Sequence, residues 1–575
     1  MTGKQHNGKI IIWAAAALFC VAALVLIFLW GSQRQNNTLL GCRLVSDEEL
    51  DEIAEGLSAN LSGFELELNG QAIEYCIQLG GYLTYCADLD SPRGALTASN
   101  GATLWISQPY TDGSNQTLCR CVAKSGEQYA ELNLILTDLP VLAITTDEEY
   151  DFINEWQPGL LPQYCKINAF IKQPEEYCTF VFFGMQNDTL DTQSGRLSFH
   201  MRGLTSITFE KKPLRLHMLD ASGGAKQRRF LNLGKDNDWI LNSLYTDSSK
   251  MRDRLSLEVW NCMAESTENE HDSSSSMAQV EVLLNGRYIG VYGLQTVLDA
   301  STQQLNKTTD YLYAPMSYHE MRDDVISGIY SAGDTEYETI TENTHGKIIS
   351  YPEDAEGNLW QPLLNYSNAI TWNYVYNGKI SMSEIQAVAD LENITDFYLW
   401  KLLTGADDNG VKNCYYAGIY DTTAYENLRF IRIPWDTNYT FGDNYATSLV
   451  SPKTLTVNNP GWSYQDFVYD PVFSFCYVAD SDIMSSLLYE RWQRLKSIVD
   501  ADSLTEYARQ LFEELDSSGG IDRDYGIYRN GGDFDIEAFC SQIYARYEYM
   551  DERINEIAND PETEYWRQRD LLLKF

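Results

Sequence analysis

The sequence has few basic residues, few histidines and no pair of cysteines at the C-x-x-C spacing. It contains 42 lysines and arginines against 82 aspartates and glutamates, which gives a formal net charge of −40. Such a charge repels phosphate backbones, so we expect no nucleic-acid partner. Six histidines, and twelve cysteines without a C-x-x-C pair, argue against a structural zinc site.

Hydrophobic and aromatic residues are abundant instead. They make up 44% and 13% of the chain, a composition typical of folded protein. At 575 residues the chain is too long for one ordinary core, so we expect two or three domains. Cys20 lies in an N-terminal apolar run, which leaves eleven of the twelve cysteines, an odd number, in the rest of the chain. Disulfides outside a cell would therefore leave at least one thiol unpaired.

The N-terminus predicts a membrane anchor. Residues 1–9 form a short polar tail, and an unbroken apolar run then extends from Ile10 to Trp30, enough to span a hydrocarbon core of ~30 Å. A cleaved signal peptide is the alternative, but its apolar region would be shorter and would end in small residues. Lysines precede the run and arginines follow it, so the positive-inside rule only slightly favours a cytoplasmic tail and extracellular C-terminal domains.

A small β-domain is expected after the anchor. Residues 31–60 read as a linker followed by a short acidic helix from Asp47 to about Asn60, with Ser46 as its N-cap. Short alternating runs separated by Gly, Asn, Asp and Ser then occupy residues 61–138. This pattern predicts a β-sandwich-like domain.

The remainder predicts an α+β domain over residues 139–555 and a C-terminal tail over 556–575. Its first part has strand patterns, a helical pattern from Ser248, and a β-hairpin turning at Asn285-Gly286. Residues 301–380 are expected to be irregular inserted loops. A helix that stops at Gly405 follows them, and the C-terminal part is helical throughout.

Two acidic clusters flank a second predicted hairpin. NCYYAGIY and NLRFIRI are expected to pair as antiparallel strands, which places Asn413 and Asp436 towards the same open end. Asp407 and Asp408 precede the first strand. Carboxylate and amide oxygens suit Mg²⁺, although each residue taken singly is more often part of a turn.

The spacing within these clusters matches a catalytic pattern. Asp408 and Asn413 reproduce the D-x-x-x-x-N of protein-kinase catalytic loops, in which the Asp accepts the substrate proton and the Asn ligates metal. Asp436 takes the place of the later metal-binding Asp, with PWD where ordinary kinases have DFG. A bare D-x4-N pattern is common by chance.

A local basic cluster stands out in this acidic chain. Arg202-Gly203 predicts a turn before a strand that carries Lys211 and Lys212. Phosphate binding is one interpretation of this cluster, and charge balance against nearby acids is the other.

Several segments in order resemble the CotH kinase family, the spore coat protein H-like proteins. The resemblance covers roughly residues 139 to 550 and rests on RG…KKPLRL, LNLGKDNDWILNSLYTDSSKMRDRLSLEV, VEVLLNGRYIGVYGL, DDNGVKN and IPWDTNYTFGD. It implies a bacterial source, an atypical protein-kinase-like two-lobe fold, and Mg²⁺- or Mn²⁺-dependent transfer of the ATP γ-phosphoryl group to protein Ser/Thr.

The resemblance also implies roles for single residues. Asp408 would be the catalytic-loop Asp, Asn413 and Asp436 the metal ligands, and Arg202 a residue that faces phosphates. Glu258 would pair a phosphate-binding lysine.

The chain departs from the family pattern on the basic side of the site. It has His217 where a second lysine is usual and Thr296 where a glutamate is common. A neutral imidazole cannot replace a permanent ammonium beside phosphates. The metal ligands are intact, but the nucleotide site is weakened.

Three functions therefore stay open. The first is a single-pass, membrane-anchored CotH-like kinase acting on protein. The second is a catalytically inactive cell-surface scaffold that binds protein or a surface polysaccharide, since ATP is scarce outside cells. The third, a glycoside hydrolase, is the weakest, because nothing sets an acid and a nucleophile at a known separation.

Overall fold

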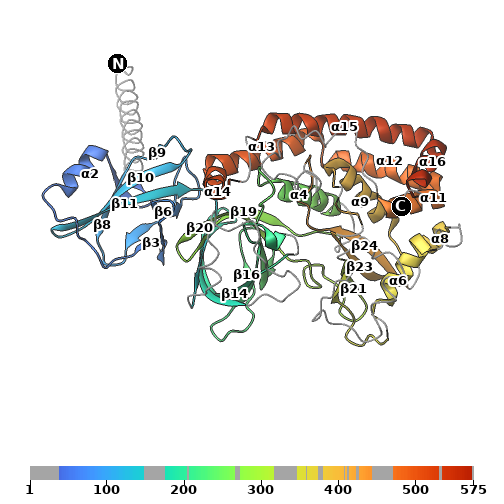
Figure 1. The fold of residues 1–575 in the computed structure, drawn as a ribbon, viewed down its shortest axis with the longest axis horizontal. Helices are drawn as coiled ribbons and strands as arrows, with labels where there is room; N and C mark the ends of the chain where they lie inside the picture. Colours follow the sequence, from blue (N-terminus) through green and yellow to red (C-terminus); the bar gives the residue numbers. More distant parts are fainter. Residues whose placement is uncertain are drawn as a thin grey trace, which may run out of the picture. The chain divides into compact units, whose positions relative to one another are not determined.

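The chain is mixed α+β, as predicted (Figure 1). Residues 10–30, the predicted anchor, lie outside the described ranges, and within those ranges no helix has the length and apolar character needed to cross a membrane. The chain divides into two compact units. The structure is a computed structural model that describes residues 38–147, 175–203, 206–265, 272–315, 346–357, 359–372, 380–406, 408–410, 413–421, 427–442, 470–529 and 534–572.

The first unit is β-rich, as the alternating runs predicted. It contains residues 38–143 together with 181–194 and 285–288. An eight-stranded sheet has the order β1-β2-β8-β10-β11-β6-β5, with β9 on β10, and a three-stranded sheet has the order β4-β3-β7. The strands are β1 (Thr38–Leu39), β2 (Cys42–Val45), β3 (Leu66–Leu68), β4 (Gln71–Ala72), β5 (Tyr75–Cys76), β6 (Gly81–Tyr85), β7 (Leu96–Ala98), β8 (Thr103–Ser107), β9 (Tyr110–Thr111), β10 (Thr117–Ser125) and β11 (Gln128–Thr137).

Helix α2 (Asp47–Ala54) begins at the predicted N-cap. Ser46 and Glu49 form a capping box: the Glu49 N–H donates to Ser46 Oγ at 3.1 Å, and the Ser46 N–H donates to the Glu49 carboxylate at 2.9 Å. The helix ends well before Asn60, because Glu55 already has an extended backbone.

Both ends of the predicted domain plan need correction. Residues 38–45 were expected in a linker, but they form β1 and β2, and β2 pairs in parallel with β8 of the large sheet. Residues 556–575 were expected to be a tail, but α16 (Pro561–Leu572) is helical and buries Glu564 and Gln568. In both places packing against distant elements decided the structure.

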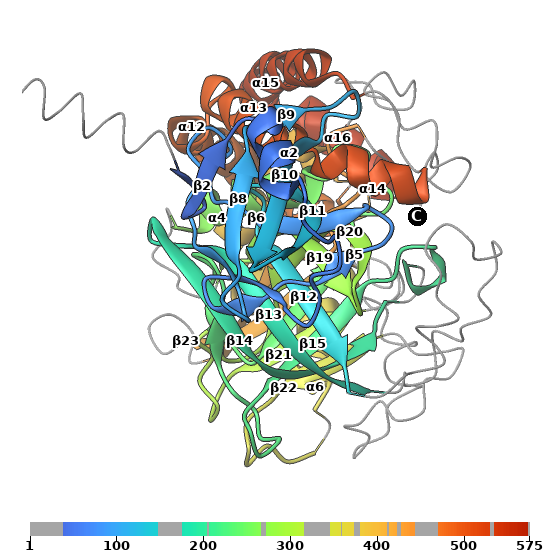
Figure 2. The same ribbon diagram turned by 90° about the vertical axis from the view of Figure 1, so that its left-hand side faces the viewer.

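A closed barrel of order β12-β13-β14-β15-β18-β20-β19 follows, and most of its residues belong to the second unit. Figure 2 shows β12, β13, β14 and β15 side by side. The predicted hairpin between β19 and β20 is present, and Asn285 and Gly286 at its turn have φ of 51° and 68°. The strands are β12 (Val141–Thr146), β13 (Glu176–Gln186), β14 (Thr189–Met201), β15 (Leu214–Leu219), β18 (Asp238–Asn242), β19 (Met277–Leu284) and β20 (Arg287–Thr296), with a separate pair β16 (Arg228–Arg229) and β17 (Lys235–Asp236).

A four-stranded sheet of order β22-β21-β23-β24 carries the second predicted hairpin, β23 (Cys414–Asp421) and β24 (Asn427–Pro434). The expectation of irregular loops over residues 301–380 was wrong for β21 (Tyr311–Pro315) and β22 (Gly346–Ser350), which extend this sheet. It was also wrong for residues 361–372, which are helical. Leu312 of β21 is fully buried in one hydrophobic cluster with residues of β23 and β24, which explains the pairing.

Helices make up the C-terminal part, as predicted. Helix α9 ends at Gly405, whose φ is 71°. The helical elements are η1 (Ser206–Thr208), α4 (Arg252–Glu265), α6 (Gln361–Ser367), the π-helical turn η2 (Asn368–Trp372), α8 (Met382–Gln386), α9 (Leu391–Thr404), α11 (Pro471–Ala479), α12 (Ser481–Ile498), α13 (Ala501–Ser517), α14 (Gly520–Tyr528), α15 (Ile536–Asn559) and α16.

The outer edge of β24 is bonded to the start of α9 and the residues before it. The Asn393 side-chain amide donates to the Arg432 carbonyl at 3.1 Å, and its carbonyl accepts from the Arg432 N–H at 2.7 Å. The Phe430 N–H donates to the Val388 carbonyl at 2.8 Å, and the Phe430 carbonyl accepts from the Asp390 N–H at 3.1 Å. These four bonds fix α9 against the hairpin.

The ten cysteines in the described residues are all free thiols, so disulfides do not link the strands described here. Burial raises the pKa of Cys42 to about 11. The thiol is therefore protonated at neutral pH and packs as a small apolar group.

Candidate active site at the open end of a hairpin

The open end of the β23–β24 hairpin brings the two acidic clusters together. Cys414 pairs with Pro434, and beyond this pair the Trp435 N–H donates to the Asn413 carbonyl at 3.0 Å. Asn413 and Asp436 therefore lie at the same end, where Pro434 stops the ladder. This is the arrangement that the two strand patterns predicted.

Both residues have a left-handed backbone. The φ angles of Asn413 and Asp436 are 58° and 56°. Asn and Asp tolerate this conformation better than other residues with a side chain, but it still costs roughly 1 kcal/mol or more. Such geometry is concentrated at functional sites.

Asp408 belongs to the same site. The Asn413 side-chain amide donates to the Asp408 carboxylate at 2.7 Å, and Asp408 is only 6% exposed. The bond orients the amide so that its carbonyl oxygen is the atom suited to a metal. The D-x-x-x-x-N spacing thus corresponds to a direct contact, whereas Asp407 lies outside the described residues.

Asn409 fixes the loops that carry these residues, and no sequence pattern predicted this role. Its fully buried side-chain amide donates to the Asn413 and Trp435 carbonyls, each at 2.7 Å. One amide therefore bridges the residue before β23 and the residue before Asp436.

Asp253 of α4 is a second residue that sequence reasoning missed. Its buried carboxylate accepts from the Thr437 N–H at 3.0 Å, from Thr437 Oγ1 at 2.8 Å and from the Asn242 amide at 3.1 Å. Asp253 thereby holds the residue that directly follows Asp436. Burial, and then repulsion from Asp436, raise the pKa of Asp253 to about 7.

The donor set fits a hard divalent cation. Asp436 is exposed and can reach a ligand from solvent, while Asp408 and Asn413 offer a carboxylate and an amide oxygen beside it. Repulsion between Asp436 and Asp253 is relieved when a cation neutralises the charge there. Asn413 and Asp436 are the residues that would hold Mg²⁺ or Mn²⁺.

Arg202 lies near this end of the hairpin, beside Trp435. Its guanidinium lies 5.8 Å from the centre of the Trp435 ring. Burial lowers the pKa of Arg202, and the Asp436 carboxylate opposes that shift. Gly203, with φ of 96°, makes the turn, and a Cβ there would meet Ser206 Oγ at 2.1 Å.

The structure places Lys211 and Lys212 in protein contacts of their own. Both precede β15 rather than lying within it, and both are fully buried. The Lys211 ammonium pairs with Asp524 and donates to the Val291 carbonyl, and Lys250 pairs with the same carboxylate at 3.1 Å. Lys212 donates to the Ile207 carbonyl at 3.0 Å and to the Phe209 carbonyl. None of these contacts includes Asp408, Asn413 or Asp436.

The charged groups that act on Glu258 in the described residues are Arg254 and Glu265, not the two lysines. Glu258 is half-buried on α4 and lines a surface hollow with Cys262, Leu504 and Tyr507. Burial raises its pKa, and Arg254, the cation that acts on it, opposes that shift.

The two departures from the family pattern have structural partners. Thr296, at the end of β20, accepts a 2.9 Å bond from the Ser276 N–H through its hydroxyl. His217 on β15 contacts Asp238 and Glu175. Both side chains therefore contact neighbouring residues of the barrel.

The comparisons with known proteins identify the family. The family model described as CotH kinase protein matches residues 199–561. No curated protein matches the chain. The matched span includes Arg202, Asp408, Asn413 and Asp436, and it covers more than half of the sequence. The chain therefore belongs to the CotH kinase protein family.

Proposed function

We propose that the chain is a membrane-anchored protein kinase that transfers the γ-phosphoryl group of ATP to a protein Ser or Thr. The observation that carries this proposal is that Asp408 and Asn413, which are hydrogen-bonded to each other, lie at the same end of the hairpin as Asp436. Family membership supports kinase-like chemistry with a nucleotide and a divalent metal in general.

Each residue has a role that its position supports. Bound Mg–ATP would supply an electrophilic phosphoryl group with its charge partly neutralised. Asp408 accepts the proton of the substrate hydroxyl as its oxygen attacks. The bond from Asn413 holds that carboxylate in one orientation. Arg202, beside Trp435, offers its guanidinium to phosphate oxygens.

The surrounding architecture is part of the proposal. The barrel and the helical part would be the two lobes of a kinase-like domain, and residues 10–30 would anchor the chain in a cell membrane with its C-terminal domains outside. The substrate would be a protein or polymer at that surface. The acidic charge supports the absence of a nucleic-acid partner.

Labelled ATP gives the direct test. The full chain in detergent, incubated with γ-labelled ATP and Mg²⁺ or Mn²⁺, should label itself or a generic protein substrate. The Asp436→Asn variant should not, whereas Asp482→Asn, at an exposed carboxylate on α12, should label normally. Equal labelling of wild type and Asp436→Asn would overturn the proposal.

A catalytically inactive scaffold is the second candidate, and one observation favours it. The ammonium groups of Lys211 and Lys212 are buried in contacts with Asp524 and backbone carbonyls. Arg202, the other residue of the basic cluster predicted from sequence, lies 5.8 Å from the centre of the Trp435 ring at the hairpin end. A melting temperature unchanged by millimolar Mg–ATP would favour the scaffold.

A further inference from the structure

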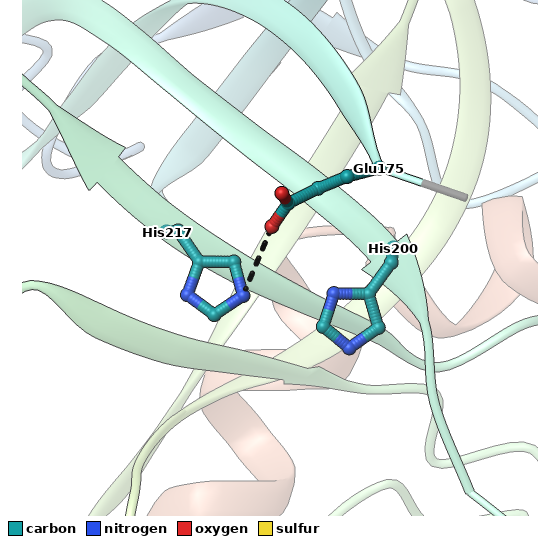
Figure 3. Close-up of side chains that lie close together, drawn as sticks. All are labelled: Glu175, His200 and His217. Atoms are coloured by element: carbon teal, nitrogen blue, oxygen red, sulfur yellow. Dashed lines mark ion pairs between the residues drawn. The ribbon is translucent and has the colours of Figure 1, made fainter. Parts of the chain in front are cut away.

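Two of the six histidines lie together with a carboxylate on the barrel wall, outside the candidate active site (Figure 3). His200 is on β14, His217 is on β15, and Glu175 directly precedes β13. Ser198 pairs with His217, so His200 is its diagonal neighbour on the same face of the sheet. The imidazole centres are 5.4 Å apart, and one ligand atom from each of the three side chains lies within 4.8 Å of the other two.

Asp238 fixes how His217 presents its ring. One Asp238 oxygen contacts His217 Nδ1, and the other accepts from Arg215 at 2.8 Å. Because a carboxylate only accepts hydrogen bonds, Nδ1 carries the hydrogen. A carboxylate behind a ligating imidazole is the usual second partner of a metal-bound histidine.

The opposite nitrogen then needs a cation. His217 Nε2 faces Glu175 Oε1 at 3.3 Å. With the hydrogen on Nδ1, Nε2 and the carboxylate present lone pairs to each other, unless a proton or a metal ion lies between them.

We propose that Glu175, His200 and His217 form a binding site for a divalent transition-metal ion, with Zn²⁺ as the best match. Two imidazole nitrogens and one carboxylate oxygen are a known three-ligand set for zinc, with a fourth position open. Metal bonds of about 2.0–2.1 Å at a tetrahedral angle place two ligand atoms about 3.4 Å apart. The Glu175–His217 separation of 3.3 Å already has this value.

The proposal is independent of kinase activity. Nitrogen ligands separate this site from the oxygen-only set at the hairpin end, which suits Mg²⁺. Glu175 is exposed, so an ion can enter from solvent. The ion would link the start of β13 to β14 and β15. Its ligand on β14, His200, lies two residues before Arg202. Few histidines and the lack of a C-x-x-C pair argued against a structural zinc site, but the fold brings together His200 and His217, which are 17 residues apart in sequence.

Zinc retention by the full chain tests the proposal. The protein is stripped with a chelator and titrated with Zn²⁺ in millimolar Mg²⁺ and Ca²⁺, which occupy oxygen-only sites on this acidic surface. Wild type should bind one zinc. His200→Ala and His217→Ala should weaken that binding at least tenfold, on the order of the loss expected for a metal ligand. Co²⁺ should give visible absorption bands in wild type that both variants lose.

Two further variants separate a metal site from an ion pair. His217→Lys keeps a cation between Asp238 and Glu175 but removes the metal-binding nitrogen, so it should keep its melting temperature without zinc and lose zinc binding. Glu65→Gln, at an exposed carboxylate of the first unit, should bind zinc like wild type. Equal zinc binding by wild type and His217→Lys, or none by wild type, would show that this cluster is only an imidazolium–carboxylate network.

Discussion

The side-chain amide of Asn413 donates a 2.7 Å hydrogen bond to the carboxylate of Asp408. The proposed base and a proposed metal ligand are therefore coupled directly. The main-chain carbonyl of Asn413 also accepts from the Trp435 N–H, so a shift of Asn413 changes the position of both loops at the hairpin end.

Replacing Asp436 should separate activity from stability. Asp436→Asn keeps a residue that tolerates φ of 56° but removes the charge that would hold the metal. We expect phosphorylation to fall by about 10²-fold or more. The free energy of unfolding should stay the same or rise, because the side chain is exposed and the loss of its charge removes its repulsion of the buried Asp253 carboxylate. Phosphate transfer and urea unfolding measure the two quantities. A variant that unfolds easily would show instead that Asp436 is structural.

The Asp408–Asn413 contact should appear as a coupling energy. In a double-mutant cycle on unfolding, Asp408→Ala and Asn413→Gly should be non-additive by about 0.5–3 kcal/mol, since each removes the same bond. Glycine is chosen because it accepts the left-handed backbone at position 413. The pair Asp408→Ala and Asn555→Ala, the latter exposed on α15, serves as the additive control. Additivity in the first cycle would contradict the bond.

Asn409 should contribute more to stability than an exposed asparagine. Asn409→Ala removes both bonds of a buried amide. The Asn413 main-chain carbonyl keeps its bond from the Trp435 N–H, but the Trp435 carbonyl loses the bond from Asn409, so the change should cost about 1–3 kcal/mol of unfolding free energy. Urea denaturation measures this cost. Asn555→Ala also removes a side-chain bond to a backbone carbonyl, but at the surface, and should cost less than about 0.5 kcal/mol. Equal costs would mean that the bridge at Asn409 does not stabilise the fold.

Asp253 should make stability fall as pH rises. Its pKa is raised from 3.8 to about 7, first by burial and then by Asp436. Between these values the folded chain holds a proton that the unfolded chain has released, so unfolding becomes easier as pH increases through this window. Asp253→Asn should remove this part of the pH dependence, on the order of a few kcal/mol between pH 4 and 7. Urea unfolding with a chelator present measures the slope for both proteins, and parallel slopes would contradict the raised pKa.

The site could be predicted where its signals are local. Alternating apolar residues predicted β23 and β24, and once the strands pair, Asn413 and Asp436 must meet. The Asp408–Asn413 bond joins residues five apart. Short-range patterns therefore placed the acidic half of the site.

Long-range partners could not be predicted in this way. Asp253 bonds to Thr437, and Lys211 pairs with Asp524, across 184 and 313 residues. No periodicity or spacing connects such positions. A buried ion pair and a phosphate-binding lysine look alike in sequence until the carboxylate partner is known. For that reason the sequence left open whether Lys211 and Lys212 bind phosphate, whereas the structure buries both in contacts with Asp524 and backbone carbonyls.

The bonds along the outer edge of β24 restrict how a polypeptide substrate can approach. An extended peptide often binds by adding a strand to an open sheet edge. Here the outward N–H and C=O groups of Phe430 and Arg432 are already bonded to Val388, Asp390 and Asn393. If the proposed kinase acts on a polypeptide, that chain cannot extend this sheet at these two residues, so its backbone would bind at another surface.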